Sequence, residues 1–265
     1  MNSIEKNDNT DSVIMLNGDA DVAAIIVHGF SDTPASMMPL AENLHASLGI
    51  TCIMPLLQGH GTSIDDFEQA SYEQWIAQVE HAYSEAASRF SHVFLIGFSM
   101  GGLLATIACA SRCAGRILIA PAFDVGIQRQ MKLWLLPIIQ YFKRYNYKNP
   151  EHTTYNRNLY DPVMREKYRL FYDREPLRAI IQYGFIRKRA LLRIRDVPSD
   201  SLVILSKADR VVDFFRTKAI IATHQPTWRI IELDRSGHMI PLDYDREIVF
   251  TVVKEFIRNK IVSAD

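Results

Sequence analysis

The strongest candidate for covalent chemistry is Ser99, which lies in the run GFSMGG at residues 97–102. The apolar stretch HVFLI precedes this run, and the helical pattern LLATIACA follows it. A serine in a glycine-flanked turn between a strand and a helix is typical of a nucleophile elbow, because the turn is strained and neighbouring Cβ atoms would collide in it. The motif predicts that Ser99 attacks an acyl carbon. A glycine-rich turn without activity is the alternative.

A serine hydroxyl needs a general base, and His238 has the most suitable place among the eight histidines. It lies in SGHM, a loop after the last predicted strand and before the C-terminal helical pattern. His28 and His60 also follow predicted strands, each before a glycine, and we expect them to shape the floor of the site. We predict His238 as the base. A surface loop histidine is the alternative.

Asp209 is the predicted carboxylate that orients the imidazole and stabilises its protonated form. It comes directly after a predicted strand, in SKADRVV. Asp124, after the preceding strand, and Asp213, four residues beyond Asp209, are the competing carboxylates. The chain order Ser99, Asp209, His238 is the order known for hydrolases with this elbow, and it favours Asp209.

Two backbone N–H groups are candidates for an oxyanion hole, which needs preorganised donors. One belongs to Met100, immediately after the predicted nucleophile. The other belongs to Phe30, in the loop HGFSDTP that follows the apolar run AAIIV. For both residues the predicted donor is the main chain.

Short apolar, β-branched runs alternate with helical patterns along most of the chain. Strands that are apolar on both faces and are joined through helices predict an α/β fold, with a mostly parallel sheet covered by helices on both faces. The predicted strands are Ala23–Val27, Ile50–Pro55, Val93–Ile96, Arg116–Ala120, Leu202–Leu205 and Arg229–Leu233. The predicted helices are Ser36–Leu48, Ser71–Phe90, Met100–Ser111, Phe215–Thr223 and Glu247–Lys260.

The alternation stops near residue 123 and resumes near residue 201, and the segment between shows no convincing strand. It is rich in aromatic and basic residues, and Arg178–Arg195 has the pattern of a basic amphipathic helix. A helical insertion between two strands of a parallel sheet lies over the carboxyl ends of the strands, where such sheets bind ligands. We therefore expect an α/β core at residues 1–125 and 199–265 and a helical lid at residues 126–198.

The net charge of zero conceals an uneven distribution of charge. Residues 1–125 carry 4 basic and 14 acidic side chains, residues 126–198 carry 16 and 6, and residues 199–265 carry 10 and 10. The pattern predicts a cationic lid on an acidic to neutral core.

Composition and length limit the class of protein. With 265 residues, 48% of them hydrophobic and 23% charged, the chain is an ordinary globular protein rather than a disordered or collagenous one. Its three cysteines predict reduced thiols, and the N-terminal MNSIEKNDNTDS lacks the features of a secretory signal. No apolar run approaches the roughly 20 residues that span a bilayer. We expect a cytoplasmic protein, either a monomer or a homodimer.

Five blocks of the sequence occur in a familiar order and spacing: HGFSDTPASMMPLAENL, QGHGTSIDDF, GFSMGG, SKADRVVD and SGHMIPLDYDRE. Together they resemble the bacterial carboxylesterase and monoacylglycerol lipase group of the α/β-hydrolases. The resemblance covers residues 22–125 and 200–260, and the lid resembles the group only in position and length. It implies an α/β-hydrolase fold with Ser99, Asp209 and His238 as nucleophile, acid and base. It also implies an oxyanion hole formed by the amides of Phe30 and Met100.

The predicted reaction is hydrolysis of a carboxylic ester or a monoacylglycerol through an acyl-enzyme on Ser99. Hydrolysis of a thioester, an amide or a C–C bond is the first alternative, and a non-catalytic ligand-binding relative is the second. The sequence has neither clustered metal-ligand residues nor a glycine-rich phosphate loop, so we expect no metal and no organic cofactor. We expect no nucleic acid partner. The basic lid is expected to contact anionic lipid surfaces transiently.

Overall fold

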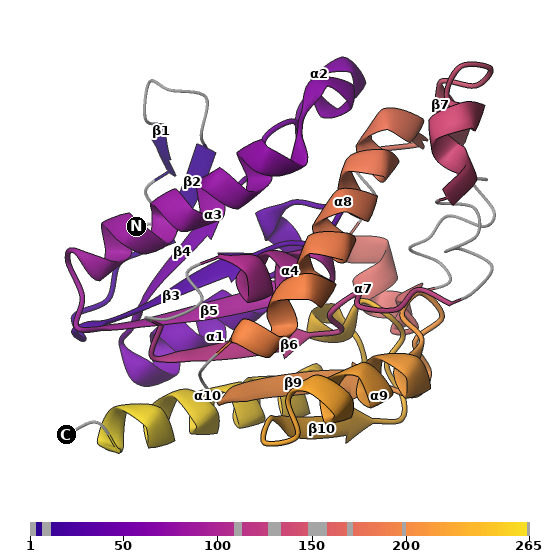
Figure 1. Ribbon diagram of the computed structural model, residues 1–265. Helices are drawn as coiled ribbons and strands as arrows, with labels where there is room; N and C mark the ends of the chain where they lie inside the picture. The colour runs from indigo at the N-terminus through magenta and orange to yellow at the C-terminus, as the bar shows by residue number, and fades with distance from the viewer. Residues whose placement is uncertain are drawn as a thin grey trace.

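The chain forms an α/β fold around one main sheet (Figure 1). The computed structural model describes residues 4–6, 12–108, 113–126, 134–147, 158–168, 172–197 and 200–263. In these ranges eight strands form the sheet, in the order β1-β2-β4-β3-β5-β6-β9-β10. Their bounds are β1 Ile4–Lys6, β2 Ser12–Leu16, β3 Val22–Val27, β4 Thr51–Pro55, β5 His92–Phe98, β6 Gly115–Ile119, β9 Ser201–Ser206 and β10 Arg229–Leu233.

The strands from β4 to β10 pair in parallel, whereas β2 runs antiparallel to both β4 and β1. Strand β5 lies at the centre, with Leu95 opposite Ile25 of β3 on one side and opposite Arg116 of β6 on the other. Because the central strands are parallel, their carboxyl ends share one edge of the sheet. The loops that carry the predicted site residues all begin at this edge.

Helices cover both faces of the sheet, as Figure 1 shows. Alternate residues of β3 enter two separate apolar clusters: Ile25 packs with residues of α3, α4 and α8, and Ile26 packs with residues of α1 and α10. The helices are α1 Met38–Leu48, α2 Ile64–Gln69, α3 Tyr72–Ala87, α4 Met100–Ile107, α7 Pro162–Lys167, α8 Leu177–Arg193, α9 Phe214–His224 and α10 Arg246–Val262. Short 3-10 turns occupy Pro34–Ser36, Ile194–Asp196 and Ile240–Leu242.

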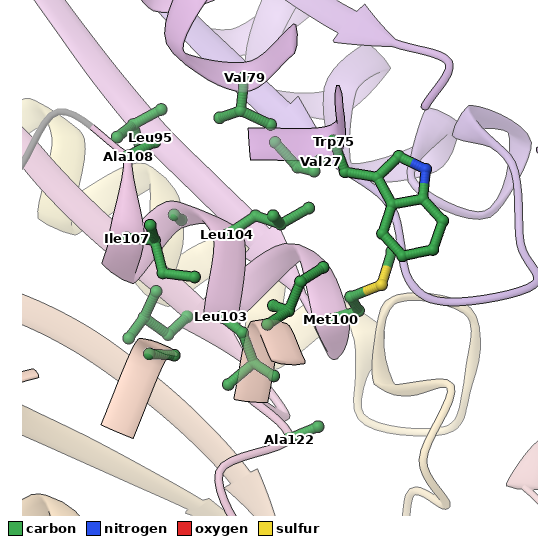
Figure 2. Packing of buried hydrophobic residues seen from close by; sticks show 14 of the residues in the cluster. Val27, Trp75, Val79, Leu95, Met100, Leu103, Leu104, Ile107, Ala108 and Ala122 are labelled. Atoms are coloured by element: carbon green, nitrogen blue, oxygen red, sulfur yellow. The ribbon is translucent and has the colours of Figure 1, made fainter. Parts of the chain in front are cut away.

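Helix α4 is the most buried helix of the described chain, since every one of its residues is buried. Figure 2 shows its apolar side chains packed among residues of β3, α3 and β5, with the sulfur of Met100 directed at the indole of Trp75. Helix α8 crosses over α4 on the outside (Figure 1). The helix that follows Ser99 is therefore held between the sheet and the insertion.

The predicted α/β fold is confirmed, and all six predicted strands and all five predicted helices are present. Two predicted helix ends are wrong. Helix α3 ends at Ala87 and not at Phe90. Helix α4 ends at Ile107, because Ala108 takes an extended conformation with φ −71° and ψ 138°. The predicted residues Cys109–Ser111 lie outside the described ranges. The antiparallel strands β1 and β2 and the short helix α2 were not predicted.

The expectation that the insertion contains no strand is also wrong. Strands β7 (Tyr145–Tyr147) and β8 (Arg174–Pro176) form a separate antiparallel pair, with Asn146 opposite Glu175. Each has only three residues, too few to show an alternating pattern, and the partners lie far apart in the chain. The predicted amphipathic helix at Arg178–Arg195 is found as α8 and the following turn.

Two of the three cysteines, Cys52 and Cys113, lie in the described chain. Cys52 is buried and Cys113 is half-buried, and burial raises the pKa of the Cys52 thiol to about 12. Cys109 lies outside the described residues. None of the described helices combines the length and the apolar character that crossing a bilayer requires.

Candidate active site

Ser99 occupies a strained turn between β5 and α4. Its φ is 54° and its ψ is −112°, a conformation that L-residues rarely adopt. The turn can form only around glycines: a Cβ at position 97 would lie 2.2 Å from the carbonyl oxygen of Gly101, and a Cβ at position 101 would lie 2.1 Å from that of Val27. The nucleophile elbow predicted from the sequence is therefore present in its geometry.

The structure brings the three predicted side chains into one hydrogen-bonded chain. Ser99 Oγ lies 2.9 Å from Nε2 of His238, and Nδ1 of the same ring lies 2.8 Å from Oδ2 of Asp209. A carboxylate accepts only, so Nδ1 carries the proton and Nε2 is free to accept the proton of the Ser99 hydroxyl. The His238 and Asp209 side chains are 8% and 2% exposed. This is the arrangement of a serine nucleophile with its base and orienting acid.

The two competing carboxylates have other partners. Asp124 lies 4.0 Å from the Arg187 guanidinium and 3.8 Å from that of Arg216, and its Oδ1 accepts a hydrogen bond from the N–H of Gly126. Asp213 caps the N-terminus of α9. Neither is hydrogen-bonded to His238.

Asp209 is fixed by its own loop. Its Oδ1 accepts hydrogen bonds from the N–H groups of Val211, at 2.7 Å, and Val212, at 3.0 Å. The second oxygen is then directed to His238. The two backbone donors therefore fix the orientation of the carboxylate toward the imidazole.

Hydrogen bonds between buried polar groups connect the loop that carries His238 to the sheet. Oδ2 of Asp245 accepts hydrogen bonds from the N–H groups of Arg235 and Ser236 and from the Ser236 hydroxyl. The Ser206 hydroxyl, at the end of β9, donates to the Ser236 carbonyl. Since Ser236 and Asp245 are buried, these bonds are not exchanged with bulk water.

The two predicted oxyanion donors belong to the first turn of α4 and to the loop after β3. Met100 is the first residue of α4, so its N–H has no acceptor within the helix. The loop of Phe30 touches the nucleophile, because a Cβ placed on Gly29 would lie 3.4 Å from the Ser99 Cβ. Within the described chain, no residue accepts a hydrogen bond from the Phe30 N–H. Both N–H groups are therefore available to a ligand next to Ser99.

His28 orients the peptide group that contains the Phe30 N–H. Its Nδ1 donates to the carbonyl of Gly29 at 2.8 Å, and its Nε2 accepts from the N–H of Leu57 at 3.1 Å. The Gly29 carbonyl and the Phe30 N–H belong to one trans peptide and point in opposite directions, so holding the oxygen fixes the direction of the N–H. Sequence reasoning placed His28 on the floor of the site but did not find this function.

Aromatic residues surround a third buried histidine, His60. Its ring lies 4.6 Å from that of Phe67 and 5.3 Å from that of Trp75, measured between centroids. The Phe30 ring joins the same cluster and also contacts Tyr183 of α8, at 5.5 Å. The oxyanion loop is thus in direct contact with the insertion.

Burial keeps both histidines neutral. It lowers the pKa of His28 to about 4, and together with the neighbouring His28 ring it lowers the pKa of His60 well below its usual range. His28 therefore cannot act as a base, because both of its nitrogens are hydrogen-bonded to the backbone.

Among the described residues, no group of three or more His, Cys, Asp or Glu side chains is arranged to hold a metal ion.

Comparison with known proteins shows the family of the chain. The sequence profile of the alpha/beta hydrolase family matches residues 24–250, and the chain belongs to this family. It is 29% identical to a thermostable monoacylglycerol lipase of Bacillus sp. (strain H-257), over 89% of this chain and 90% of that protein. It is 20% identical to a carboxylesterase of Bacillus subtilis (strain 168), over 90% of this chain and 93% of that one.

Solved structures show the same fold. A structure of the metagenome-derived lipolytic enzymes LipS and LipT matches with a TM-score of 0.81 and 25% identity, and the match covers 93% of this chain and 97% of that one. The resemblance to the esterase and monoacylglycerol lipase group, recognised from five sequence blocks, is therefore confirmed.

The pKa of His28 leads to a prediction about stability. The folded protein leaves His28 unprotonated down to about pH 4, whereas the unfolded chain binds a proton near pH 6.5. The unfolded state therefore binds more protons in this window, and the free energy of unfolding should fall as the pH falls from about 6.5 to 4, by about 3 kcal/mol from this residue. Urea denaturation of wild type and His28→Asn at several pH values checks it. The variant should show a shallower dependence, and parallel curves would contradict the prediction.

Proposed function

We propose that this protein is a serine hydrolase that cleaves carboxylic esters, monoacylglycerols among them, through an acyl-enzyme on Ser99. The observation that carries the proposal is the hydrogen-bonded chain from Ser99 through His238 to Asp209. The names of the two bacterial relatives, a monoacylglycerol lipase and a carboxylesterase, support the choice of an ester bond.

In the first half-reaction, Ser99 Oγ attacks the carbonyl carbon while its proton moves to Nε2 of His238. Negative charge forms on the carbonyl oxygen, and the N–H groups of Phe30 and Met100 stabilise it. Asp209 stabilises the imidazolium, which then protonates the departing alkoxide. The products of this half-reaction are the free alcohol and an ester of Ser99.

The second half-reaction repeats these steps with water. His238 removes a proton from the water as it attacks the acyl carbon, and the tetrahedral intermediate forms at the same two N–H groups. Collapse of the intermediate returns the proton from Nε2 to Ser99 Oγ and releases the carboxylic acid. The proposed chemistry needs no group beyond these side chains and amides.

A chain-length panel tests the proposal. Wild type should hydrolyse p-nitrophenyl esters or monoacylglycerols, and Ser99→Ala should lower kcat by at least about 10⁴-fold, because the triad residues act as a unit. Ser47→Ala, which alters an exposed serine on α1, is the matched control and should keep wild-type turnover. The length dependence of kcat/KM would also give the depth of the acyl site.

The same panel separates the alternatives. Acyl-thioesters and N-terminal proline amides belong in it, since a Ser-His-Asp site acts on several acyl groups. Faster turnover of one of these would replace esters as the substrate class. Full activity of Ser99→Ala, or no turnover of any substrate by wild type, would contradict the proposal.

Residues 126–198 are proposed to act as a lid over this site. Helix α8 packs on α4, the helix that follows Ser99 in the chain, and its Tyr183 contacts the ring of Phe30. The hydroxyl of Tyr172 donates to the carbonyl of Gly59, in the loop after β4. These contacts support the division between the core, residues 1–125 and 199–265, and the lid. The cytoplasmic location and the choice between monomer and homodimer stay predictions.

An exposed apolar face of the lid supports a lipid surface as a transient partner. Leu136 is buried here, but five large apolar or aromatic side chains nearby are exposed: Trp134 88%, Leu135 53%, Ile138 63%, Tyr141 82% and Phe142 88%. The lid carries a net positive charge, so an anionic bilayer complements it. We propose that this face rests on anionic lipid while the active site takes up its substrate.

Vesicle binding tests this partner. Wild type should bind phosphatidylglycerol vesicles, more weakly as salt is added. The double variant Trp134→Ser with Phe142→Ser should bind at least about tenfold more weakly, because it loses two exposed aromatic side chains that the lipid would bury. Phe215→Ser removes an aromatic on α9 that is 77% exposed and lies outside residues 126–198, and it should bind as wild type does. Salt-insensitive activity together with no vesicle binding would contradict the proposal.

A further inference from the structure

Four residues of the insertion, Asn158 to Asp161, lie against both loops that carry the predicted base and acid. We refer to residues 158–161 as the strap. The carbonyl of Asn158 accepts a hydrogen bond from the N–H of Met239 at 2.9 Å, next to His238. The hydroxyl of Tyr160 donates to the carbonyl of Ala208 at 2.9 Å, next to Asp209.

Asp243 joins the strap to the His238 loop through a fully buried carboxylate. Its Oδ1 accepts from the N–H groups of Asp161, at 2.8 Å, and Tyr244, at 2.9 Å. Its Oδ2 accepts from those of Tyr160, at 2.9 Å, and Gly237, at 2.7 Å. One carboxylate therefore connects two peptide groups of the strap with the residue directly before His238. Four N–H donors are an adequate substitute for the water that a buried carboxylate gives up.

The fit between the strap and the two loops is close. A Cβ at position 237 would lie 2.4 Å from the carbonyl oxygen of Asn158, so only glycine allows this approach. On the other loop, the guanidinium of Arg210 lies 5.8 Å from the centre of the Tyr160 ring. Asp209 is thus preceded and followed by residues that contact Tyr160.

The strap is itself anchored in the core. The Leu159 side chain is completely buried among residues of the sheet and of α1 and α10. The guanidinium of Arg246, at the start of α10, pairs with Asp161 at 2.7 Å, and that of Arg165 donates twice to the Leu159 carbonyl, at 3.0 and 2.7 Å. The strap is therefore anchored in the core, unlike the exposed part of the lid.

We infer that Tyr160 and Asp243 are positioning residues, which hold Asp209 and His238 at hydrogen-bonding distance from each other. Neither touches the reacting atoms. Tyr160 acts through the carbonyl of Ala208, in the peptide before Asp209, and Asp243 acts through the N–H of Gly237, the residue before His238. The insertion thereby helps to hold the base and the acid in place in addition to covering the site. This inference rests on the proposed function, because it concerns the base of that reaction.

Tyr160→Phe is the decisive variant, since it removes one hydroxyl and no charge. Loss of a hydrogen bond of this kind should lower kcat by about threefold to tenfold for a p-nitrophenyl ester, with little change in KM. A less firmly held Asp209 stabilises the imidazolium less, so the acid limb of the pH profile of kcat/KM should move to lower pH. A loss of folded protein alone would not move this limb.

Tyr168→Phe is the matched control. It removes a hydroxyl at the end of α7 that makes no hydrogen bond to any described residue, and it should keep the wild-type kcat and pH profile.

Asp243→Asn is the second variant. Its amide nitrogen replaces one acceptor oxygen, so two N–H groups lose their acceptor, and kcat should fall further than in Tyr160→Phe.

The outcomes are separable from those of the proposed function. Absence of Ser99-dependent turnover in wild type would overturn the function itself. An active wild type with the same kcat and acid limb in Tyr160→Phe would overturn the strap inference alone. A folded Asp243→Asn variant with wild-type kcat would overturn the role of Asp243. If Asp243→Asn does not fold, Tyr160→Phe decides.

Discussion

The whole site depends on one strained residue, Ser99, whose φ of 54° turns the chain sharply from β5 into α4. The conformation costs free energy, on the order of 1–3 kcal/mol, and it persists because the surrounding structure leaves no other path. Gly97 and Gly101 allow the backbones of β5, α4 and β3 to meet, and the burial of α4 between the sheet and α8 holds the turn. In return, the hydroxyl stands at the edge where all parallel strands end, within reach of three other loops.

Two of the buried histidines at this edge, His28 and His238, differ in their hydrogen-bond partners, and the partners determine what each ring can do. His28 has backbone groups on both nitrogens and no charged partner, so its ring is neutral and serves as a rigid spacer behind the Phe30 N–H. His238 has a carboxylate on Nδ1 and a hydroxyl on Nε2, so it can accept a proton and keep the resulting charge stabilised. Location next to a strand end does not distinguish them. The hydrogen-bond partners do.

Much of this arrangement could be predicted from the sequence because the signals are local. The glycines around Ser99 indicate the elbow within six residues, and Asp209 and His238 each follow a strand that is recognisable from its own apolar pattern. The strap could not be predicted in this way. Asp243 accepts hydrogen bonds from Tyr160 and Asp161, which lie 83 and 82 residues away in the chain, and no local sequence pattern indicates these contacts. Strands β7 and β8 could not be predicted for the same reason, since they are short and pair with each other across a long stretch of chain.

The uneven charge of the sequence also has a structural counterpart. Several cations of the insertion face anions of the acidic core: Arg144 pairs with Asp65 and Glu68 of α2, and Arg187 lies near Asp124. Part of the positive charge of the insertion therefore pairs with the core.

The central claim is that Ser99 is a nucleophile activated by His238. Labelling with a fluorophosphonate probe, followed by mass spectrometry of the digested protein, tests it most directly, because the probe reacts only with an activated hydroxyl. Wild type should carry a single adduct on the peptide that contains Ser99, and His238→Ala should label more slowly by about 10³-fold or more. An adduct on another residue, or equal labelling rates in wild type and His238→Ala, would contradict it.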